Sequence, residues 1–400
     1  MSTRPENLNV RVIFALTLIH FTGDFYNSFV TPLLPVFADR FVLTLTEVGL
    51  IGGLSRFLAF IVQPNVGYLA DRYRTRFFIL GGLLIGIVFI PLTGIAPTFL
   101  LLLVFVALGS TGSAMFHPSV AGMVYSYAGS RPGLSMSIFN TGGTLAFALG
   151  PVFIAWYVSS RGLEAMPVIM LPGLMLMVYL YRVVPVPDVE RFENSGFVAS
   201  FRETFGEIWR WIALIWLIMV FRSFAEHVYR TFVPVLFVQE GYSLVAVGVM
   251  ISLFTLAGTL SGLLAGHLSD RIGFKKIFYT TYLLSVPSLI AILFASGFWL
   301  YPAVFLAGFF IMATLPLGVT MGQELAPKGR SMVASLMMGF AFGFGGTMTP
   351  VAGAFADVLS IRTVLAGVAV IPALLLGLVY FLPDRRERSP DAGDDRTDRM

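Results

Sequence analysis

Two short charged stretches decide the fold: Gly67-Tyr-Leu-Ala-Asp71-Arg72-Tyr-Arg-Thr-Arg76 and Gly266-His-Leu-Ser-Asp270-Arg271-Ile-Gly-Phe-Lys-Lys276. Each lies between two long apolar runs. The second copy follows the first by 199 residues, since 266 − 67 = 199, and the same offset relates their Asp and Arg residues. Further along the chain, the offset pairs Arg131 with Arg330 and Pro151 with Pro350. A register that persists over this distance indicates two copies of one structural unit.

The composition is that of a membrane protein. The 400 residues are 57% hydrophobic and 12% charged, whereas a soluble domain carries about 25% charged residues. The first apolar run is too long for a signal peptide and is expected to be a membrane span. The absence of Cys excludes disulfides and thiolate metal sites. Basic residues in the inner loops explain the net charge of +4, so no nucleic-acid partner is expected.

The apolar runs predict an all-α protein with twelve transmembrane helices. A spanning helix needs about 20 mostly apolar residues. By this measure the expected spans are 10–38, 46–70, 77–95, 98–125, 134–158, 164–184, 210–238, 243–268, 277–296, 299–324, 331–356 and 362–382. They form an N-terminal six-helix bundle (1–184) and a C-terminal one (210–383), joined by a linker (185–209). The tail, 384–400, is predicted to be disordered.

The distribution of Lys and Arg predicts the orientation. With the N-terminus placed in the cytoplasm, only Arg40, Arg161 and Arg362 fall on the outer side, while most of the others lie in inner loops. The positive-inside rule therefore predicts two cytoplasmic termini in a bacterial inner membrane. Apolar residues at spacings of three and four within 197–209 predict an amphipathic helix along the inner surface.

Ionisable and polar side chains inside the spans are the candidate site, because each such charge costs about 2.5 kcal/mol or more at the membrane centre. The candidates for substrate or proton binding are His20, Asp24, Asn27, Arg56, Gln63, His117, Arg222, Glu226, His227, Arg230, Gln323 and Glu324. We expect them to line a water-filled cavity between the bundles. No cofactor, metal site or catalytic residue is predicted.

Arg56 and Asp24 carry the functional hypothesis. The fork of an Arg side chain suits carboxylate, phosphate or phosphonate, so the arginines favour an anionic substrate. Asp24 is the candidate proton carrier. The alternatives are that Arg56 only pairs with Asp24, and that Arg222, Glu226 and Arg230 neutralise one another. His117, which precedes a proline, has a functional and a purely structural interpretation.

The two charged stretches resemble the signature loop of the major facilitator superfamily. The resemblance covers all twelve spans, although Tyr73 stands where the signature usually has Gly. It implies that Gly67, Asp71, Arg72, Gly266, Asp270 and Arg271 belong to gating segments. In that family the Asp at the position of Asp71 meets the N-terminal end of span 11 and holds the inner gate shut. Members of the superfamily mostly act as monomers, which is the expectation here.

A second resemblance is more specific. His20-x-x-x-Asp24, Gln63-Pro64-x-x-Gly67, Phe116-His117-Pro118, Phe221-Arg222-Ser223 and Gly322-Gln323-Glu324-Leu325 are similar to motifs of the fosmidomycin-resistance branch. This branch implies export of drugs or metabolites by proton antiport. The chain differs from it at Ser119, where the branch has an acidic residue. The antiporter signature of span 5 is also incomplete, with Ala146 in place of a Gly.

The leading hypothesis is therefore a proton-coupled exporter of small anionic or amphipathic compounds that works by alternating access. An importer of an organic anion with co-transported protons uses the same fold and is the main alternative. An intramembrane enzyme would need a nucleophile with a base, and no such set is evident. A sensor or scaffold without transport would be expected to carry large soluble extensions.

Overall fold

The computed structural model describes residues 8–70, 73, 75–187, 206, 208–326, 333 and 335–383. Over these ranges the chain forms helices joined by short turns. The elements are α1 (Val10–Asn27), α2 (Val30–Phe41), α3 (Leu45–Ala70), η1 (Phe77–Gly81), α4 (Gly82–Leu92), η2 (Thr93–Ile95), α5 (Phe99–Tyr127), α6 (Pro132–Arg161), η3 (Leu163–Ile169), α7 (Met170–Val183), α9 (Trp209–Gln239), α10 (Leu244–Ile272), α11 (Phe274–Phe294), η4 (Gly297–Trp299), α12 (Leu300–Met312), α13 (Thr314–Leu325), η5 (Ser335–Ala341), α15 (Phe342–Thr347), α16 (Thr349–Val358), α17 (Ile361–Val368) and α18 (Ile371–Tyr380).

Ten helical segments in the described part of the chain are long and apolar enough to cross a membrane. They correspond to ten of the twelve predicted spans. The other two predicted spans, 10–38 and 331–356, are interrupted, the first between α1 and α2 and the second around η5, α15 and α16. Proline weakens the helix at both breaks, because Pro32 and Pro350 have no N–H to donate to the preceding turn. Pro118 and Pro151 lie inside the unbroken helices α5 and α6, so proline alone does not end a helix. The hydroxyl of Thr349 donates to the freed carbonyl of Gly346 at 2.6 Å.

The charged stretches that were predicted as loops begin inside helices. Gly67 lies in the last turn of α3, and Gly266, Asp270 and Arg271 lie in the last turns of α10. Helix α10 continues to Ile272 and ends at Gly273. The backbone of Gly273 has a φ of 87°, a conformation that glycine adopts without strain. Asp71 and Arg72 lie outside the described residues. So do most of the predicted surface helix at 197–209 and the whole tail at 384–400.

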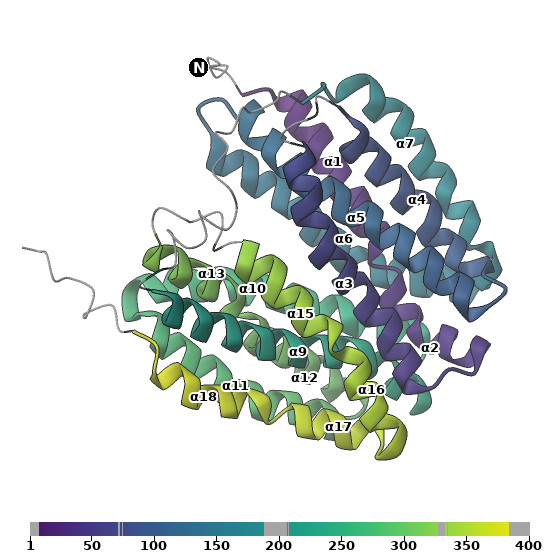
Figure 1. Ribbon diagram of the computed structural model, residues 1–400. Helices are drawn as coiled ribbons and strands as arrows, with labels where there is room; N and C mark the ends of the chain where they lie inside the picture. The colour runs from purple at the N-terminus through teal and green to yellow at the C-terminus, as the bar shows by residue number, and fades with distance from the viewer. Residues whose placement is uncertain are drawn as a thin grey trace, which may run out of the picture.

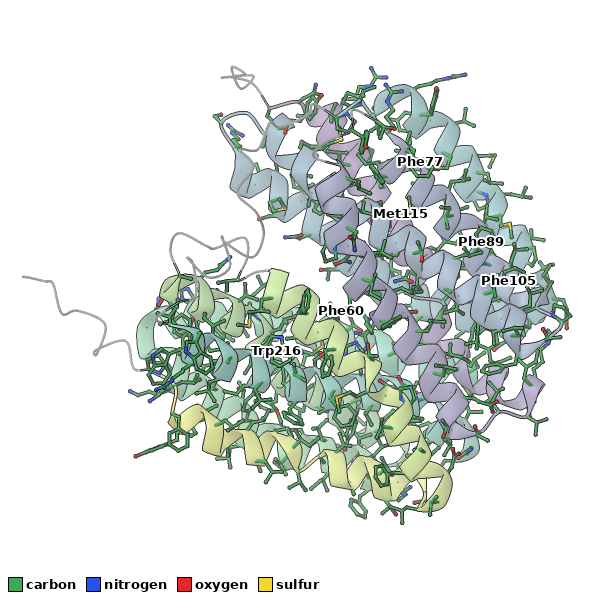
Figure 2. The ribbon with its side chains drawn as sticks, viewed as in Figure 1. Phe60, Phe77, Phe89, Phe105, Met115 and Trp216 are labelled. Carbon is green, nitrogen blue, oxygen red and sulfur yellow. The ribbon has the colours of Figure 1, made fainter. Side chains whose placement is uncertain are left out.

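Figure 1 shows two helical bundles that meet at one end, near α2 and α16, and diverge toward the end that carries the N-terminus. Helices α1 to α7 build the first bundle and α9 to α18 the second. Phe60 lies where the bundles approach each other (Figure 2), and its ring is 4.4 Å from that of Phe340. Large apolar side chains such as Leu263 and Met175 are exposed, as expected where lipid is the solvent.

The contact between the bundles repeats the sequence duplication. A Cβ on Gly49 of α3 would lie 2.8 Å from the Cα of Pro350 in α16. A Cβ on Gly248 of α10 would lie 2.6 Å from the carbonyl oxygen of Pro151 in α6. Both pairs keep the offset, since 248 − 49 = 199 and 350 − 151 = 199. The two crossings are thus equivalent positions of the two units, and glycine permits the close approach in both.

One polar contact joins the bundles at the end where they meet. The carboxylate of Asp357, at the end of α16, accepts hydrogen bonds from the backbone N–H of Leu45 at 2.6 Å and of Thr46 at 3.0 Å. The Thr46 hydroxyl donates to the same carboxylate at 2.6 Å. Asp357 therefore caps the N-terminus of α3, where the helix dipole favours a negative charge. Burial raises the pKa of Asp357, but the bonds from Thr46 and Leu45 outweigh it, so the pKa is below its ordinary value.

We predict that Asp357→Asn shifts the protein from the conformation in which the bundles meet at this end toward one in which they separate there. The lost charge at a helix N-terminus is worth about a two- to fivefold change in the ratio of the two states. Because the pKa of Asp357 is lowered, its contribution is present at neutral pH and is lost as the pH falls through that lowered value. Distances between spin labels at Val42 and Leu359 measure the ratio. Identical distance distributions in variant and wild type, at both neutral and acidic pH, would contradict the prediction.

Candidate functional site

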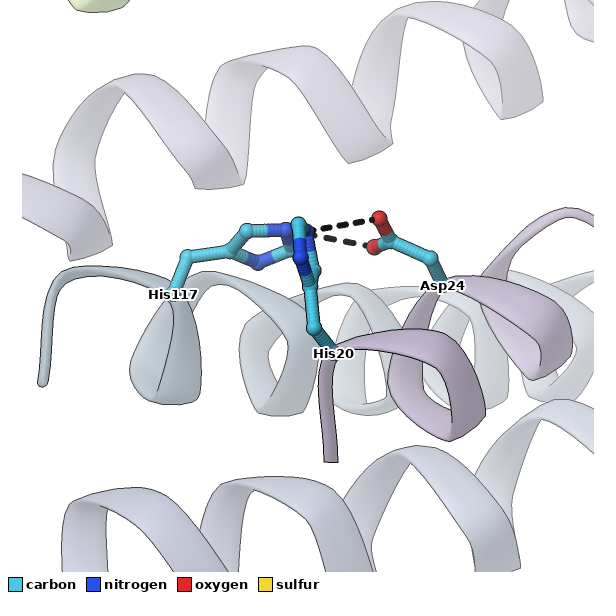
Figure 3. Close-up of side chains that lie close together, drawn as sticks. All are labelled: His20, Asp24 and His117. Carbon is cyan, nitrogen blue, oxygen red and sulfur yellow. Dashed lines mark ion pairs between the residues drawn. The ribbon is translucent and has the colours of Figure 1, made fainter. Parts of the chain in front are cut away.

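Three ionisable side chains converge in the N-terminal bundle (Figure 3). Nε2 of His20 lies 3.2 Å from one carboxylate oxygen of Asp24, and Nε2 of His117 lies 3.2 Å from the other. His20 and Asp24 are one turn apart on α1, as their spacing predicted, whereas His117 comes from α5. The Asp24 side chain is 4% exposed. The ion-pair partners of Asp24 are therefore two histidines, and not Arg56.

Hydrogen bonds to main-chain carbonyls define the orientation of both rings. Nδ1 of His20 lies 2.9 Å from the carbonyl oxygen of Phe139, and Nδ1 of His117 lies 2.7 Å from that of Ser113. A carbonyl oxygen only accepts, so each Nδ1 carries a proton and donates it. Each Nε2 then faces a carboxylate oxygen, and that contact is attractive only with a proton between the two atoms. The His20–Asp24–His117 triad thus has two positions for exchangeable protons.

Glycines on α6 make room for the triad. A Cβ on Gly143 would lie 2.6 Å from Nε2 of His20 and 2.9 Å from a carboxylate oxygen of Asp24. A Cβ on Gly142 would lie 2.8 Å from the Thr17 side chain of α1. These two glycines serve packing within one bundle. Gly346 of α15 instead lies at the interface, where a Cβ would be 2.7 Å from Cβ of Arg56.

A second charged group lies in the C-terminal bundle on α9. The guanidinium of fully buried Arg222 donates to Glu226 and, through Nε, to the carbonyl oxygen of Ile311 at 3.0 Å. Nη1 of Arg230 lies 3.4 Å from the other carboxylate oxygen of Glu226. Glu226 thus holds two arginines, as the four-residue spacing predicted. Arg222 is shielded from solvent, whereas the Arg230 side chain is 14% exposed.

Arg56 bridges the two bundles through aromatic contacts. Its guanidinium lies over the ring of Phe342, 4.8 Å from the centroid, which is a cation–π arrangement. The same ring is 4.6 Å from that of His227. Phe342 was not among the predicted site residues. Phe340, Phe342 and Phe344 alternate in an apolar span, and the sequence does not show which of them faces Arg56.

A cavity that opens to solvent connects these groups, and the empty space in the cavity and at its mouth is about 1030 Å³. Both bundles contribute to its lining: Asp24, Asn27, Arg56, Gln63 and His117 from the first, and His227 and Arg230 from the second. The further polar lining residues include Ser55 and Ser110, whose hydroxyls are 2.7 Å apart. Sequence analysis could have included these serines, because hydroxyl groups inside apolar spans indicate a polar cavity. Gln323 and Glu324 lie on α13, outside this lining, and Arg222 and Glu226 stand behind it.

Comparison with known proteins identifies the family. A model of the Major Facilitator Superfamily matches residues 16–350 and 215–398. The chain belongs to this superfamily. The duplicated charged stretch and the two helical bundles are therefore explained by common descent with its transporters, and the chain is a multi-pass protein of the bacterial inner membrane and not an enzyme.

Two relatives of this superfamily transporter are resistance proteins. The fosmidomycin resistance protein of Escherichia coli (strain K12) is 27% identical, with 97% of this chain and 96% of the relative covered. The quinolone resistance protein NorA of Staphylococcus aureus is 25% identical, with 86% and 91% covered. The resemblance to the fosmidomycin-resistance branch is thereby confirmed.

Solved structures confirm the fold. A bacterial homologue of the human lysosomal transporter Spinster, in an inward-facing and occupied conformation, superposes with a TM-score of 0.80, 17% identity and coverage of 93% of this chain and 96% of that one. The nucleoside transporter NupG gives a TM-score of 0.78 at 14% identity, with 93% and 99% covered. At these identities the similarity concerns the fold alone.

We predict that Gly143→Ala disrupts the triad. The added methyl group would overlap the His20–Asp24 pair, and overpacking of this kind costs about 1–3 kcal/mol. The matched control is Gly122→Ala on α5, where a Cβ would meet nothing within 4 Å and where alanine favours the helix. Thermal unfolding of the purified variants should show a lower midpoint for Gly143→Ala only. Equal midpoints for both variants would show that the pair has room to adjust.

Proposed function

We propose that this transporter exports a small anionic or amphipathic compound in exchange for protons, by alternating access. The observation that carries the proposal is the cavity lined from both bundles by Asp24, His117, Arg56 and Arg230. In this one cavity, Asp24 and His117 would exchange protons, and the guanidinium groups of Arg56 and Arg230 would bind an anion. The resistance functions of the two relatives support export as the direction.

We further infer the topology. With twelve spans and both termini in the cytoplasm, the end at which the bundles diverge faces the cytoplasm, and the end closed by Asp357 and Thr46 faces outward. This corresponds to an inward-facing state, which is also the state named for the Spinster homologue. Rocking of the bundles about the Gly49–Pro350 and Gly248–Pro151 crossings would then open the outer end.

Exchange requires that substrate and protons exclude each other. The triad provides a means: a substrate that contacts Asp24 directly, through an O–H or N–H group, replaces a proton on the carboxylate. Arg56 and Arg230 would hold the anionic group of the same molecule. Release of the substrate outside would leave Asp24 and the histidines free to take up protons for the return step.

The second candidate is import of an organic anion together with protons. It is favoured by one feature, namely that Asp24 and His117 of the triad line the same cavity as Arg56. Protons on the triad add positive charge there and strengthen the attraction for an anion. Substrate and protons would then bind together, as a co-transporter requires, and the direction would be inward.

The pH dependence of substrate affinity distinguishes the two. For the exporter, affinity should rise as the pH is raised, because protons and substrate compete. For the importer, it should fall. In both cases Asp24→Asn should remove most of the pH dependence and uncouple transport from a proton gradient. The measurement is binding at pH 6 and pH 8, followed by uptake into inside-out and right-side-out vesicles. Full proton dependence in Asp24→Asn would exclude the triad as the coupling site.

We predict that Arg56→Ala weakens the binding of anions by about 10- to 150-fold, because a charge-assisted hydrogen bond is worth about 1.5–3 kcal/mol. Arg56→Lys should recover only part of this loss, since it keeps the charge without the fork. The matched control is Arg161→Ala at the exposed end of α6. A thermal-shift screen against phosphonates, phosphorylated metabolites and carboxylates measures the effect. A screen whose ligands are all cationic would refute the anionic substrate.

A further inference from the structure

The His20–Asp24–His117 triad brings together side chains that can ligate a transition metal (Figure 3). Nε2 of each histidine lies 3.2 Å from an oxygen of the Asp24 carboxylate. The ligand atoms of the three residues all lie within 4.8 Å of one another. Donors around one tetrahedral Zn²⁺ are about 3.3 to 3.5 Å apart, because each lies about 2.0 to 2.2 Å from the ion. One ion can therefore contact all three residues after small side-chain movements.

The main chain already orients both imidazole rings as a metal site requires. A histidine that binds a metal donates its other ring N–H to a carbonyl or carboxylate, which leaves the second nitrogen free to coordinate. Nδ1 of His20 donates to the carbonyl oxygen of Phe139. Nδ1 of His117 donates in the same way to Ser113. Oδ1 of Asp24 is buried and has no hydrogen-bond partner in the described part of the chain, and a coordinated ion would satisfy it.

An ion would have both an entry path and an open coordination position. Asp24 and His117 line the cavity that opens to solvent. Three protein ligands leave a fourth position for water or for an anion in the cavity, as in open zinc sites. The spacing of histidines along the sequence predicted no metal site, because His117 follows Asp24 by 117 − 24 = 93 residues and comes from another helix.

We propose that the triad binds one divalent transition-metal ion, for which Zn²⁺ is the best match. Imidazole nitrogens favour Zn²⁺, Cu²⁺ and Ni²⁺, whereas Mg²⁺ and Ca²⁺ prefer sites built from oxygen atoms. The ion and the exchangeable protons proposed above would occupy the same side chains, so the ion would inhibit transport. The binding itself depends on neither the substrate nor the direction of transport.

The test uses Co²⁺, because its visible absorption is intense in a four-coordinate protein site and weak when the ion is hydrated. Tag-free, full-length protein in detergent is titrated without substrate and without a proton gradient. We expect one Co²⁺ per chain, displaced by an equal concentration of Zn²⁺ but not of Mg²⁺. Zn²⁺ should also raise the midpoint of thermal unfolding, since an ion that binds only the folded state stabilises it. A wild type that leaves the spectrum of hydrated Co²⁺ unchanged would rule out the site.

His117→Gln is the main variant, because the His117 side chain is 29% exposed and its replacement should disturb the packing little. We expect Co²⁺ binding to weaken by about 10- to 100-fold or more, since the loss of even an outer partner of a metal ligand costs that much. His20→Gln on α1 should give the same loss, so the result does not depend on one variant folding. The matched control is His267→Gln, an exposed histidine on α10, which should bind Co²⁺ like the wild type.

The outcomes separate this site from the proposed function. Equal losses in His267→Gln and His117→Gln would indicate adventitious binding by surface histidines and would overturn the proposal. Binding that persists in both His117→Gln and His20→Gln would contradict it as well. Because the readout involves no transport, a wild type that fails to bind Co²⁺ leaves the proposed proton exchange intact. Full proton dependence of transport in Asp24→Asn would instead contradict the exchange role and leave the Co²⁺ result unchanged.

Discussion

The cost of burying a charge in an apolar medium is the constraint on which this structure depends. The described spans carry Asp24, Arg56, Arg222, Glu226 and Arg230, and each would be unstable against lipid. Each is instead found with a partner: Asp24 with two histidines, Glu226 with two arginines, and Arg56 with an aromatic face. Asp24, Arg56 and Arg230 line the cavity between the bundles, whereas Arg222 and Glu226 lie outside its lining.

The charged group on α9 and the His20–Asp24–His117 triad have different surroundings. Arg222 and Glu226 are fully buried, and Arg222 also donates to the carbonyl oxygen of Ile311. Nη1 of Arg222 has no hydrogen-bond partner among the described residues. The His20–Asp24–His117 triad is different, because Asp24 and His117 border a cavity. The same physical rule, that a buried charge must be paired, yields a network away from the cavity in one bundle and a triad that borders the cavity in the other.

The closed end of the molecule is built from weaker and reversible contacts. Backbone approaches at Gly49 and Gly248 bring helices of the two bundles together. The Asp357 contact adds hydrogen bonds to a helix terminus, which are readily exchanged for water. It has no counterpart under the sequence offset, since 357 − 199 = 158 and residue 158 is Val. The α3–α16 and α6–α10 crossings are therefore equivalent under the duplication, whereas the Asp357 contact occurs only beside the α3–α16 crossing.

The sequence by itself determined the duplication, the apolar spans and the pairing of Arg222, Glu226 and Arg230, because repeat register, hydropathy and helical spacing are local properties. It also placed His20 and Asp24 on one face. Only the tertiary structure decided that His117, 93 residues after Asp24, completes the triad, and that Phe342 receives Arg56. It also revealed the breaks in the first and eleventh predicted spans, where a proline removes one hydrogen bond but packing decides whether the helix ends. Contacts between distant helices depend on how whole bundles pack, and no local pattern encodes that geometry.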